Sequence, residues 1–245
     1  MNKKLQDIYA FLKANRSYNK PIQIGSYKMA LLPYETTFEK VYALLYNTLN
    51  SQSQVNMDKS AIFFKRIAAS KSNLNSLADF LKTIGGTAQT PLTYKSIFEL
   101  LTKQESWGDK TAALFVKAVY HCHVGYANEF HFWNDAPKEL SKEDELFLPV
   151  DAVIYFIFKT IGSPCSNTFL GINKYLKINF SKSNFEVWDD LWFWGFITQK
   201  SSGKTRIMQF NEEKYWNLLD APKDQNTINK TKQLANQFID LIKRN

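Results

Sequence analysis

Cysteine, histidine and long apolar segments are all scarce in this chain. Its two cysteines, Cys122 and Cys165, are too few for a disulfide framework or for a cluster bound by four thiolates, and they fit a reducing cytosol. No apolar stretch reaches the roughly 18–20 residues that cross a bilayer, so we expect a soluble protein with no membrane partner. Leu5, Ile8 and Leu12 recur at helical spacing, which favours an amphipathic N-terminal helix over a signal peptide.

The three histidines limit the possible chemistry. His121 and His123 are two residues apart on a predicted helix and therefore point to different faces. No carboxylate pattern near them or near His131 completes a tetrahedral metal site, and no Ser-His-Asp arrangement is convincing. We therefore expect structural or exposed histidines and no bound metal.

The chain is basic, with a net charge of +8 and a pI near 9.2, carried by 27 lysines and only four arginines. Such a surface favours polyanionic partners, although a soluble protein with a lysine-rich shell would show the same excess. Aromatic residues make up 15% of the chain and include six tryptophans. Most are expected in the core, but basic charge with spare aromatic rings also suits the binding of unstacked bases.

Apolar residues recur at helical spacing in nearly the whole chain, which predicts an all-α protein. The exception is the segment 21–33, where two prolines and a glycine predict irregular backbone. The other expected helices cover residues 35–50, 58–69, 73–83, 93–103, 109–123, 152–161, 166–178, 184–196 and 227–243.

Several helix starts can be assigned from capping residues. Asp151 is expected to cap the apolar, buried helix 152–161, and Ser183–Glu186 and Ser141–Asp144 have the pattern of capping boxes. The segment Gly125–Lys142 is expected to be a loop. Gly203-Lys204-Thr205 resembles the end of a phosphate-binding loop, but the first glycine and a preceding strand are missing, so a basic loop is expected instead.

The segment Ser106–Ala112 follows the pattern small–apolar–Gly–x–Lys–x–Ala between two predicted helices. Gly108 is expected to allow a tight turn whose backbone amides, with the start of the second helix, can bind a phosphate. Here the sequence resembles the helix-hairpin-helix superfamily of DNA glycosylases. The resemblance implies that Trp107, Gly108 and Asp109 contact a DNA phosphate, which would position DNA without reading its sequence. An ordinary helix turn is the alternative.

The element Leu148–Asp151 strengthens the resemblance. The family has a Pro-Val-Asp element that enters a buried helix after the hairpin, and its aspartate faces the nucleotide to be cleaved. In members with a lysine on the second hairpin helix, that lysine is the nucleophile. The resemblance therefore implies that Lys110 is the nucleophile and that Asp151 is its electrostatic partner.

Further matches concern the damaged base. Gln52, in the segment 48–54, aligns with a glutamine that reaches the lesion, although a polar loop is an alternative. The archaeal 8-oxoguanine glycosylases, a branch of the superfamily, have a second lysine two turns after the first, which Lys117 matches. They also hold the base between an acidic residue and a tryptophan four apart, and Asp190 and Trp194 have this spacing. The alternative for this pair is an aromatic core cluster.

One feature departs from the family pattern. Lys110 and Asp151 are 41 positions apart, more than in most members and more than in the archaeal branch. The extra length is the segment Gly125–Phe147, whose role the resemblance does not explain. The matches are scattered over roughly residues 40–200 and do not form a continuous similarity.

The resemblance implies one glycosylase domain over residues 1–245, with two helical subdomains flanking a cleft. Subdomain one would comprise residues 1–34 and 152–245. Subdomain two would comprise residues 35–151 and contain the hairpin at about 93–123.

The implied activity is base-excision repair with an abasic-site lyase step. The damaged nucleotide leaves the stack, and the neutral amine of Lys110 attacks C1′ of the sugar and expels an oxidised purine, expected to be 8-oxoguanine. Partial burial and the nearby Lys117 would favour the neutral amine. Asp151 would stabilise positive charge on the sugar and accept a proton, and β-elimination from the Schiff base would nick the strand. No metal or redox cofactor takes part.

The expected partner is damaged double-stranded DNA, bound by a monomer in the cytoplasm and, in a prokaryote, at the nucleoid. The alternative is a non-catalytic helix-hairpin-helix module, which would keep the basic surface and the hairpin but have no pocket around Lys110.

Overall fold

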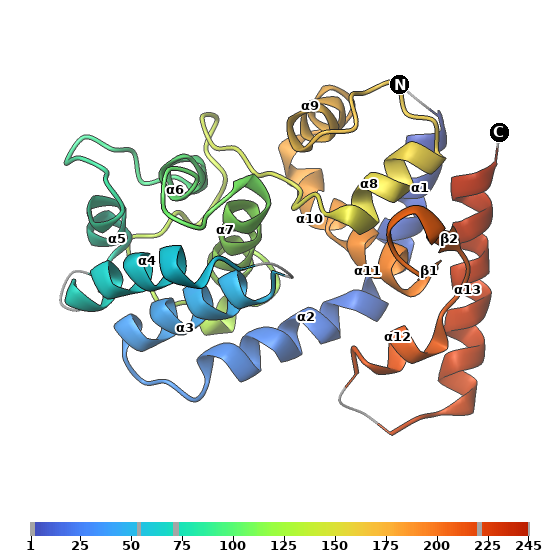
Figure 1. Ribbon diagram of the computed structural model, residues 1–245, viewed down its shortest axis with the longest axis horizontal. Helices are drawn as coiled ribbons and strands as arrows, with labels where there is room; N and C mark the ends of the chain where they lie inside the picture. The colour runs from blue at the N-terminus through green and yellow to red at the C-terminus, as the bar shows by residue number, and fades with distance from the viewer. Residues whose placement is uncertain (1–2, 53–54, 71–73, 220–221, 245) are drawn as a thin grey trace. The chain divides into compact units, whose positions relative to one another are not determined.

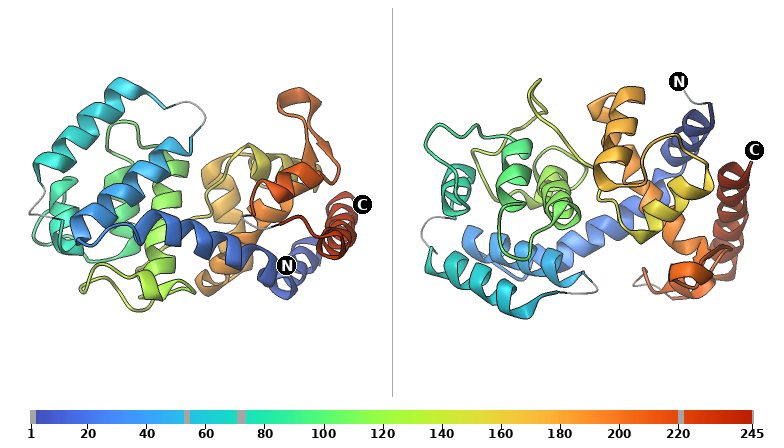
Figure 2. Two further views of the ribbon diagram at one scale, coloured as in Figure 1. Left: turned by 90° about the horizontal axis from the view of Figure 1, so that it is seen from below. Right: turned by 45° about the horizontal axis from the view of Figure 1, so that its top comes forward.

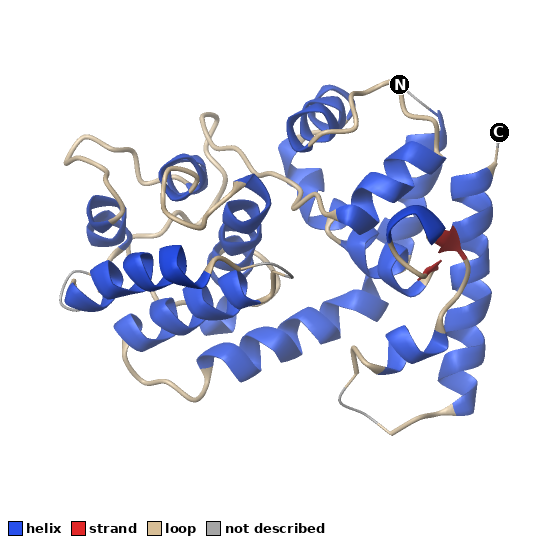
Figure 3. Cartoon of the chain, viewed as in Figure 1, coloured by secondary structure: helices blue, strands red, loops and turns tan. Residues whose placement is uncertain are grey.

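The computed structural model describes residues 3–52, 55–70, 74–219 and 222–244. Helices account for most of this part of the chain, and its only strands, β1 (Gln199–Lys200) and β2 (Ile207–Met208), form one antiparallel pair (Figure 1, Figure 3). The prediction of an all-α protein is confirmed. Within these ranges, no helix combines the length and the apolarity that crossing a membrane requires.

The chain folds into two compact units. Unit 1 comprises Met1–Ile22 and Val150–Asn245, and unit 2 comprises Gln23–Pro149. The chain thus leaves unit 1 and later returns to it. The first boundary between the units falls inside a helix.

That helix, α2 (Arg16–Leu31), shows that the irregular backbone expected over residues 21–33 was wrong. Pro21 lies inside the helix, where a proline removes one backbone hydrogen bond and costs about 3 kcal/mol. Tyr27 and Leu31, further along the same helix, are buried. We infer that packing of this apolar face offsets the local cost of the proline.

Unit 2 is built around α7 (Asp109–His123), a helix whose side chains are buried on most sides. The helices α3 (Thr37–Asn50) and α6 (Tyr94–Leu101) pack against it. Gly85, with φ of 100°, follows α5 (Leu77–Thr83) and provides the predicted helix stop. Asn73, the expected start of that helix, lies outside the described residues. The remaining elements of unit 2 are α4 (Met57–Ala69) and the short η2 (Asn128–Phe130).

In unit 1, α8 (Ala152–Thr160) packs against α11 (Asp190–Ile197) at close range. A Cβ atom on Gly195 would lie 2.5 Å from Ile157 Cδ1 and 2.7 Å from Val153 Cγ1, so a larger residue there would push the two helices apart. The helices α1 (Lys3–Ala14) and α13 (Gln225–Lys243) also pack together, as the views in Figure 2 show. The remaining elements are α9 (Phe169–Asn179), η3 (Lys182–Asn184), α10 (Phe185–Trp188), η4 (Gly203–Thr205) and α12 (Glu212–Trp216).

The single helix expected over residues 184–196 is divided between α10 and α11, with Asp189 at the junction. The capping box predicted at Ser183 is not formed, because α10 begins after Asn184 without a side-chain cap and is preceded by the 3-10 turn η3.

The long segment Gly125–Phe147 is attached to unit 2 by specific hydrogen bonds. The indole of Trp133 donates to the carbonyl of Leu74 at 3.0 Å. The carboxylate of Asp135 accepts from the amides of Leu77 and Ala78, at 2.7 and 2.9 Å, and so caps α5. We infer that the segment has a structural role and stabilises unit 2.

Asp144, in the same segment, caps a helix other than the one expected. The capping pattern Ser141–Asp144 starts no helix. The Oδ1 atom of Asp144 instead accepts from the amide of Lys95 at 3.1 Å, in the first turn of α6. The side chain thus has the predicted function of a cap, but for a helix that precedes it in the chain.

The cap at α5 can be tested with Asp135→Ala. The substitution leaves two partly buried amides without an acceptor, and we expect it to lower the free energy of unfolding by about 2 kcal/mol. Urea unfolding followed by circular dichroism measures the change. Glu139→Ala, which removes an exposed carboxylate from the same segment, is the matched control and should change stability by less than about 0.5 kcal/mol.

Candidate functional site

The turn between α6 and α7 is anchored by Trp107. Its side chain is only 3% exposed, and its ring contacts those of Phe63 and Phe115, with centroids 5.3 and 5.9 Å apart. Its backbone amide donates to the carbonyl of Gln104 at 3.2 Å. Trp107 therefore has neither an exposed ring nor a spare amide for a phosphate, which corrects the binding role expected from the sequence. It holds the turn in place.

The backbone of this turn also differs from the expectation for Gly108. The left-handed residue is Ser106, with φ of 69°, whereas Gly108 is extended with φ of −95°. The hydroxyl of Ser106 donates to the carbonyl of Asn56 at 3.2 Å, and this bond helps to hold the unusual conformation. A Cβ atom on Gly108 would meet nothing within 4 Å. The glycine is thus not required by the turn and leaves open space beside the backbone.

Helix α7 begins without a side-chain cap. Capping side chains are present at the starts of α3, α4, α6, α8, α9 and α13. At α7 the N-cap is Gly108, which has no side chain to supply one. Among the described residues, the amides of Asp109, Lys110 and Thr111 have no acceptor. Uncapped amides at a helix start attract an anion, and Gly108 and Asp109 are exposed here.

Lys110 lies in the first turn of α7, on the second helix of the hairpin as expected. It is partly exposed, and within the described ranges its ammonium group has no hydrogen-bond or ion-pair partner. Lys117 is seven positions later on the same helix, roughly 10 Å along the axis. The two residues are thus about two helical turns apart, but both side chains leave α7 on a similar face.

Gln52 follows the end of α3, in agreement with a helix that ends in Ser-Gln. Its side-chain amide donates to the carbonyl of Thr48 at 3.2 Å and to the hydroxyl of Ser51 at 2.8 Å. Its own helix end therefore holds the side chain in this structure. The last two residues of the segment, Ser53 and Gln54, lie outside the described residues.

Asp151 is the N-cap of α8, as predicted. Its Oδ1 atom accepts from the amides of Val153 and Ile154, at 2.9 and 3.1 Å. Its Oδ2 atom accepts from the indole nitrogen of Trp192 on α11, at 3.0 Å. Three hydrogen bonds thus fix the carboxylate within unit 1.

The hydrogen bond between Trp192 and Asp151 is not predicted by the sequence. The ring of Trp192 is stacked on that of Phe196, with centroids 4.9 Å apart and an angle of 11° between the planes. The only available signal was that a tryptophan in an apolar helix needs an acceptor for its N–H group. Nothing in the spacing indicates Asp151 as that acceptor.

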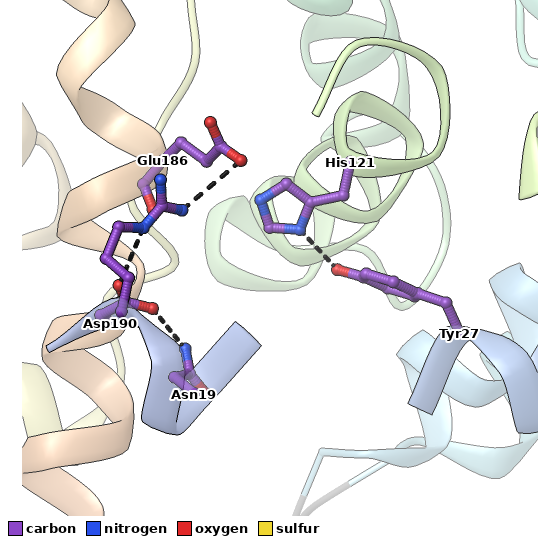
Figure 4. A network of polar contacts seen from close by, with 6 residues as sticks. Asn19, Tyr27, His121, Glu186 and Asp190 are labelled. Carbon is purple, nitrogen blue, oxygen red and sulfur yellow. Dashed lines mark hydrogen bonds and ion pairs between the residues drawn. The ribbon is translucent and has the colours of Figure 1, made fainter. Parts of the chain in front are cut away.

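Asp190 lies inside unit 1, with only 2% of its surface exposed. Its Oδ1 atom accepts from Asn19 at 2.7 Å, and its Oδ2 atom accepts from the Arg16 guanidinium at 3.2 Å. The same guanidinium also lies 3.4 Å from the carboxylate of Glu186. Figure 4 shows this group together with a separate hydrogen bond in unit 2, between Tyr27 and His121. Both oxygens of Asp190 are thus engaged within the protein.

Trp194 is likewise an interior residue, with no exposed surface. Its ring contacts those of Phe11, Tyr18 and Phe238. A ring enclosed in this way has no face on which a base could stack. The alternative of an aromatic core cluster therefore describes Trp194, and Asp190 and Trp194 form no base grip in this structure.

Burial raises the pKa of Asp190 to about 7, although the hydrogen bond from Asn19 and the charge of Arg16 act in the opposite direction. The neighbouring Asp189 adds to the increase. Desolvation of the carboxylate therefore outweighs its stabilising partners.

The three histidines differ in exposure, and His131 is exposed. His121 is fully buried and its Nδ1 atom lies 2.8 Å from the hydroxyl of Tyr27. Burial lowers the pKa of His123 to about 4, and His131 acts in the same direction. Burial also raises the pKa of the Cys122 thiol to about 12. In the part of the chain that the structure describes, no three histidine, cysteine or carboxylate side chains are grouped as metal ligands.

Comparison with known proteins gave no relative: the chain matches no protein-family model, no curated protein and no solved structure.

The buried carboxylate of Asp190 leads to a pH-dependent stability. The folded pKa of Asp190, about 7, lies above the ordinary value of 3.8. The contribution of this group to the free energy of unfolding is therefore fully present below about pH 4 and is lost as the pH rises through 7. We expect the wild type to lose more stability than Asp190→Asn between about pH 5 and about pH 8. Urea unfolding at several pH values measures this difference. The exposed carboxylate of Asp240 on α13 provides the control, since Asp240→Asn should follow the wild type.

Proposed function

We propose that this protein is a base-excision DNA glycosylase with an abasic-site lyase step, acting on an oxidised purine such as 8-oxoguanine. The observation that carries the proposal is the hairpin α6–α7. It combines an exposed, uncapped helix start with an unpaired lysine, Lys110, in the first turn of that helix. The net charge of +8 and the resemblance of the hairpin and the Pro-Val-Asp element to DNA glycosylases support it.

The chemistry follows from these groups. The amides at the start of α7 would donate hydrogen bonds to a phosphate of the damaged strand, with Gly108 allowing the backbone to approach closely. Lys110 would attack C1′ of the unstacked nucleotide, form a C–N bond and release the base. After ring opening, the Schiff base would lose a proton from C2′, and the bond to the 3′ phosphate would break.

Asp151 would supply the negative charge that this reaction needs. Its fixed carboxylate would stabilise positive charge on the sugar and accept the proton that Lys110 loses. Gln52 and Lys117 remain candidates for contact with the base. Asp190 and Trp194 do not, because both are interior residues of unit 1.

A non-catalytic helix-hairpin-helix module that binds DNA is the second candidate. The interior positions of Asp190 and Trp194 favour it, because they remove the base grip on which a glycosylase of the archaeal type depends. Such a module needs only the hairpin amides and the basic surface.

Covalent trapping separates the two candidates. The protein is incubated with duplex DNA that contains 8-oxoguanine, in the presence of borohydride, which reduces a Schiff base to a stable link. We expect a cross-linked species with the wild type and none with Lys110→Gln, because glutamine has no nucleophilic amine. Lys95→Gln, which removes an exposed cation from the adjacent α6, is the matched control and should be trapped like the wild type.

If Lys110→Gln is trapped as efficiently as the wild type, Lys110 is not the nucleophile. If the wild type cleaves no member of a panel of damaged bases but binds DNA in a salt-dependent manner, the binding module is the correct function.

The hairpin contact itself can be tested with Gly108→Ala. The added methyl group meets no protein atom, so it should cost less than about 1 kcal/mol of stability while obstructing a phosphate at the α7 amides. We expect affinity for duplex DNA, measured by fluorescence anisotropy, to fall roughly tenfold. Gly25→Ala in α2, where a methyl group also meets nothing, is the control and should bind as the wild type does. Equal affinity of both variants would exclude the hairpin as a phosphate contact.

A further inference from the structure

In unit 1, the buried side chain of Gln199 connects the first turn of α8 to two cations. Its amide nitrogen donates to the carbonyl of Val153 at 3.1 Å, two residues after Asp151. Its side-chain oxygen accepts from the Arg206 guanidinium at 2.7 Å. Its backbone carbonyl accepts from the ammonium group of Lys214 at 2.6 Å. One residue, with no exposed surface, therefore holds Arg206 and Lys214 close together.

These two cations have no anionic partner in the described part of the chain. Their hydrogen bonds are to neutral oxygens of Gln199. The nearest acidic residues in the sequence are engaged elsewhere: Glu212 accepts from the indole of Trp216 at 3.1 Å, and Glu213 lies 3.8 Å from Lys223. Both cations are partly exposed, so a ligand from solvent can reach them.

The proximity of the two charges is unfavourable without an anion. Burial lowers the pKa of Lys214, and the positive charge of Arg206 lowers it further. An anion placed against both groups would remove this repulsion and would receive charge-assisted hydrogen bonds from a guanidinium and an ammonium group.

A series of contacts joins this pair to Asp151. The Lys214 ammonium group lies 4.6 Å from the centre of the Phe196 ring. That ring is stacked on Trp192, whose indole donates to Asp151. All of these residues belong to unit 1. The two cations therefore lie beside the side chains that fix the candidate catalytic carboxylate.

We propose that Arg206 and Lys214 form a binding site for a phosphate group of a DNA strand, separate from the α7 hairpin. The site would hold the backbone of the strand whose nucleotide faces Asp151. The exposed Lys200 and Lys204, on and between the strands of the β1–β2 hairpin, add positive charge on the same hairpin. The assignment of the phosphate to DNA rests on the proposed function, whereas the anion site formed by the two cations does not.

The test uses the full-length protein and a fluorescein-labelled DNA duplex, with binding measured by anisotropy over a range of NaCl concentrations. For Arg206→Gln/Lys214→Gln we expect a loss of affinity of about tenfold or more, and a salt slope smaller by about 1 to 2. The matched control Lys230→Gln/Lys232→Gln removes two exposed cations from α13 of the same unit and should lose less than about threefold. Arg206→Lys/Lys214→Arg keeps both charges and should recover most of the affinity.

Thermal unfolding of the same variants separates binding from structure. A double variant that unfolds at lower temperature but binds DNA within twofold of the control would overturn the proposal. Competition identifies the ligand: an unlabelled oligonucleotide should displace the labelled duplex far better than an equal concentration of inorganic phosphate. Equal competition would mean a general anion site and would overturn the assignment to DNA.

Borohydride trapping of the wild type distinguishes this inference from the proposed function. No trapping, with a specific loss of binding in the double variant, would reject the glycosylase and keep the phosphate site. Normal trapping, with unchanged binding in the double variant, would reject the phosphate site alone.

Discussion

Every α-helix begins with amide groups that its own carbonyls cannot reach, and the arrangement of this chain depends on how those amides are satisfied. Local side chains cap most of the longer helices, as the capping box at Thr36 does for α3. In the stretch 135–151, three carboxylates cap helices: Asp135 at α5, Asp144 at α6 and Asp151 at α8. Against this background the bare start of α7 is chemically distinct. Its N-cap is the exposed Gly108, which supplies no side-chain acceptor, and an anion from solvent is the partner that such a position favours.

The same constraint accounts for the long connection between Lys110 and Asp151. The segment Gly125–Phe147 covers unit 2 with buried aromatic rings and supplies the caps of two helices. Phe147 at its end is stacked on Phe98 of α6, with centroids 4.2 Å apart. The additional length therefore stabilises the unit that carries the hairpin.

Local patterns predicted the helices well and the partners of side chains poorly. The bounds of α7 and the cap at Asp151 followed from residues adjacent in the sequence. Pro21 was misleading because the stability of α2 comes from buried side chains that no local rule includes. Asp190 and Trp194 are four residues apart, as expected of a pair that holds a base. In the structure, Asp190 instead belongs to a buried ion pair, and Trp194 is a core aromatic ring. Local sequence patterns do not indicate these roles, because the partners Arg16 and Phe11 are far away in the sequence.

The geometry around Asp151 limits what this carboxylate can do. An ionised carboxylate has about four positions at which it can accept a hydrogen bond. Two amides of α8 and the indole of Trp192 occupy three of them. About one position is therefore left for a ligand, enough to receive a proton from an amine or to face a positively charged sugar. A carboxylate that is held this firmly cannot turn towards a substrate. In the proposed function, the substrate would therefore have to be brought to it, and the phosphate contact proposed at Arg206 and Lys214 in the same unit would fulfil this role.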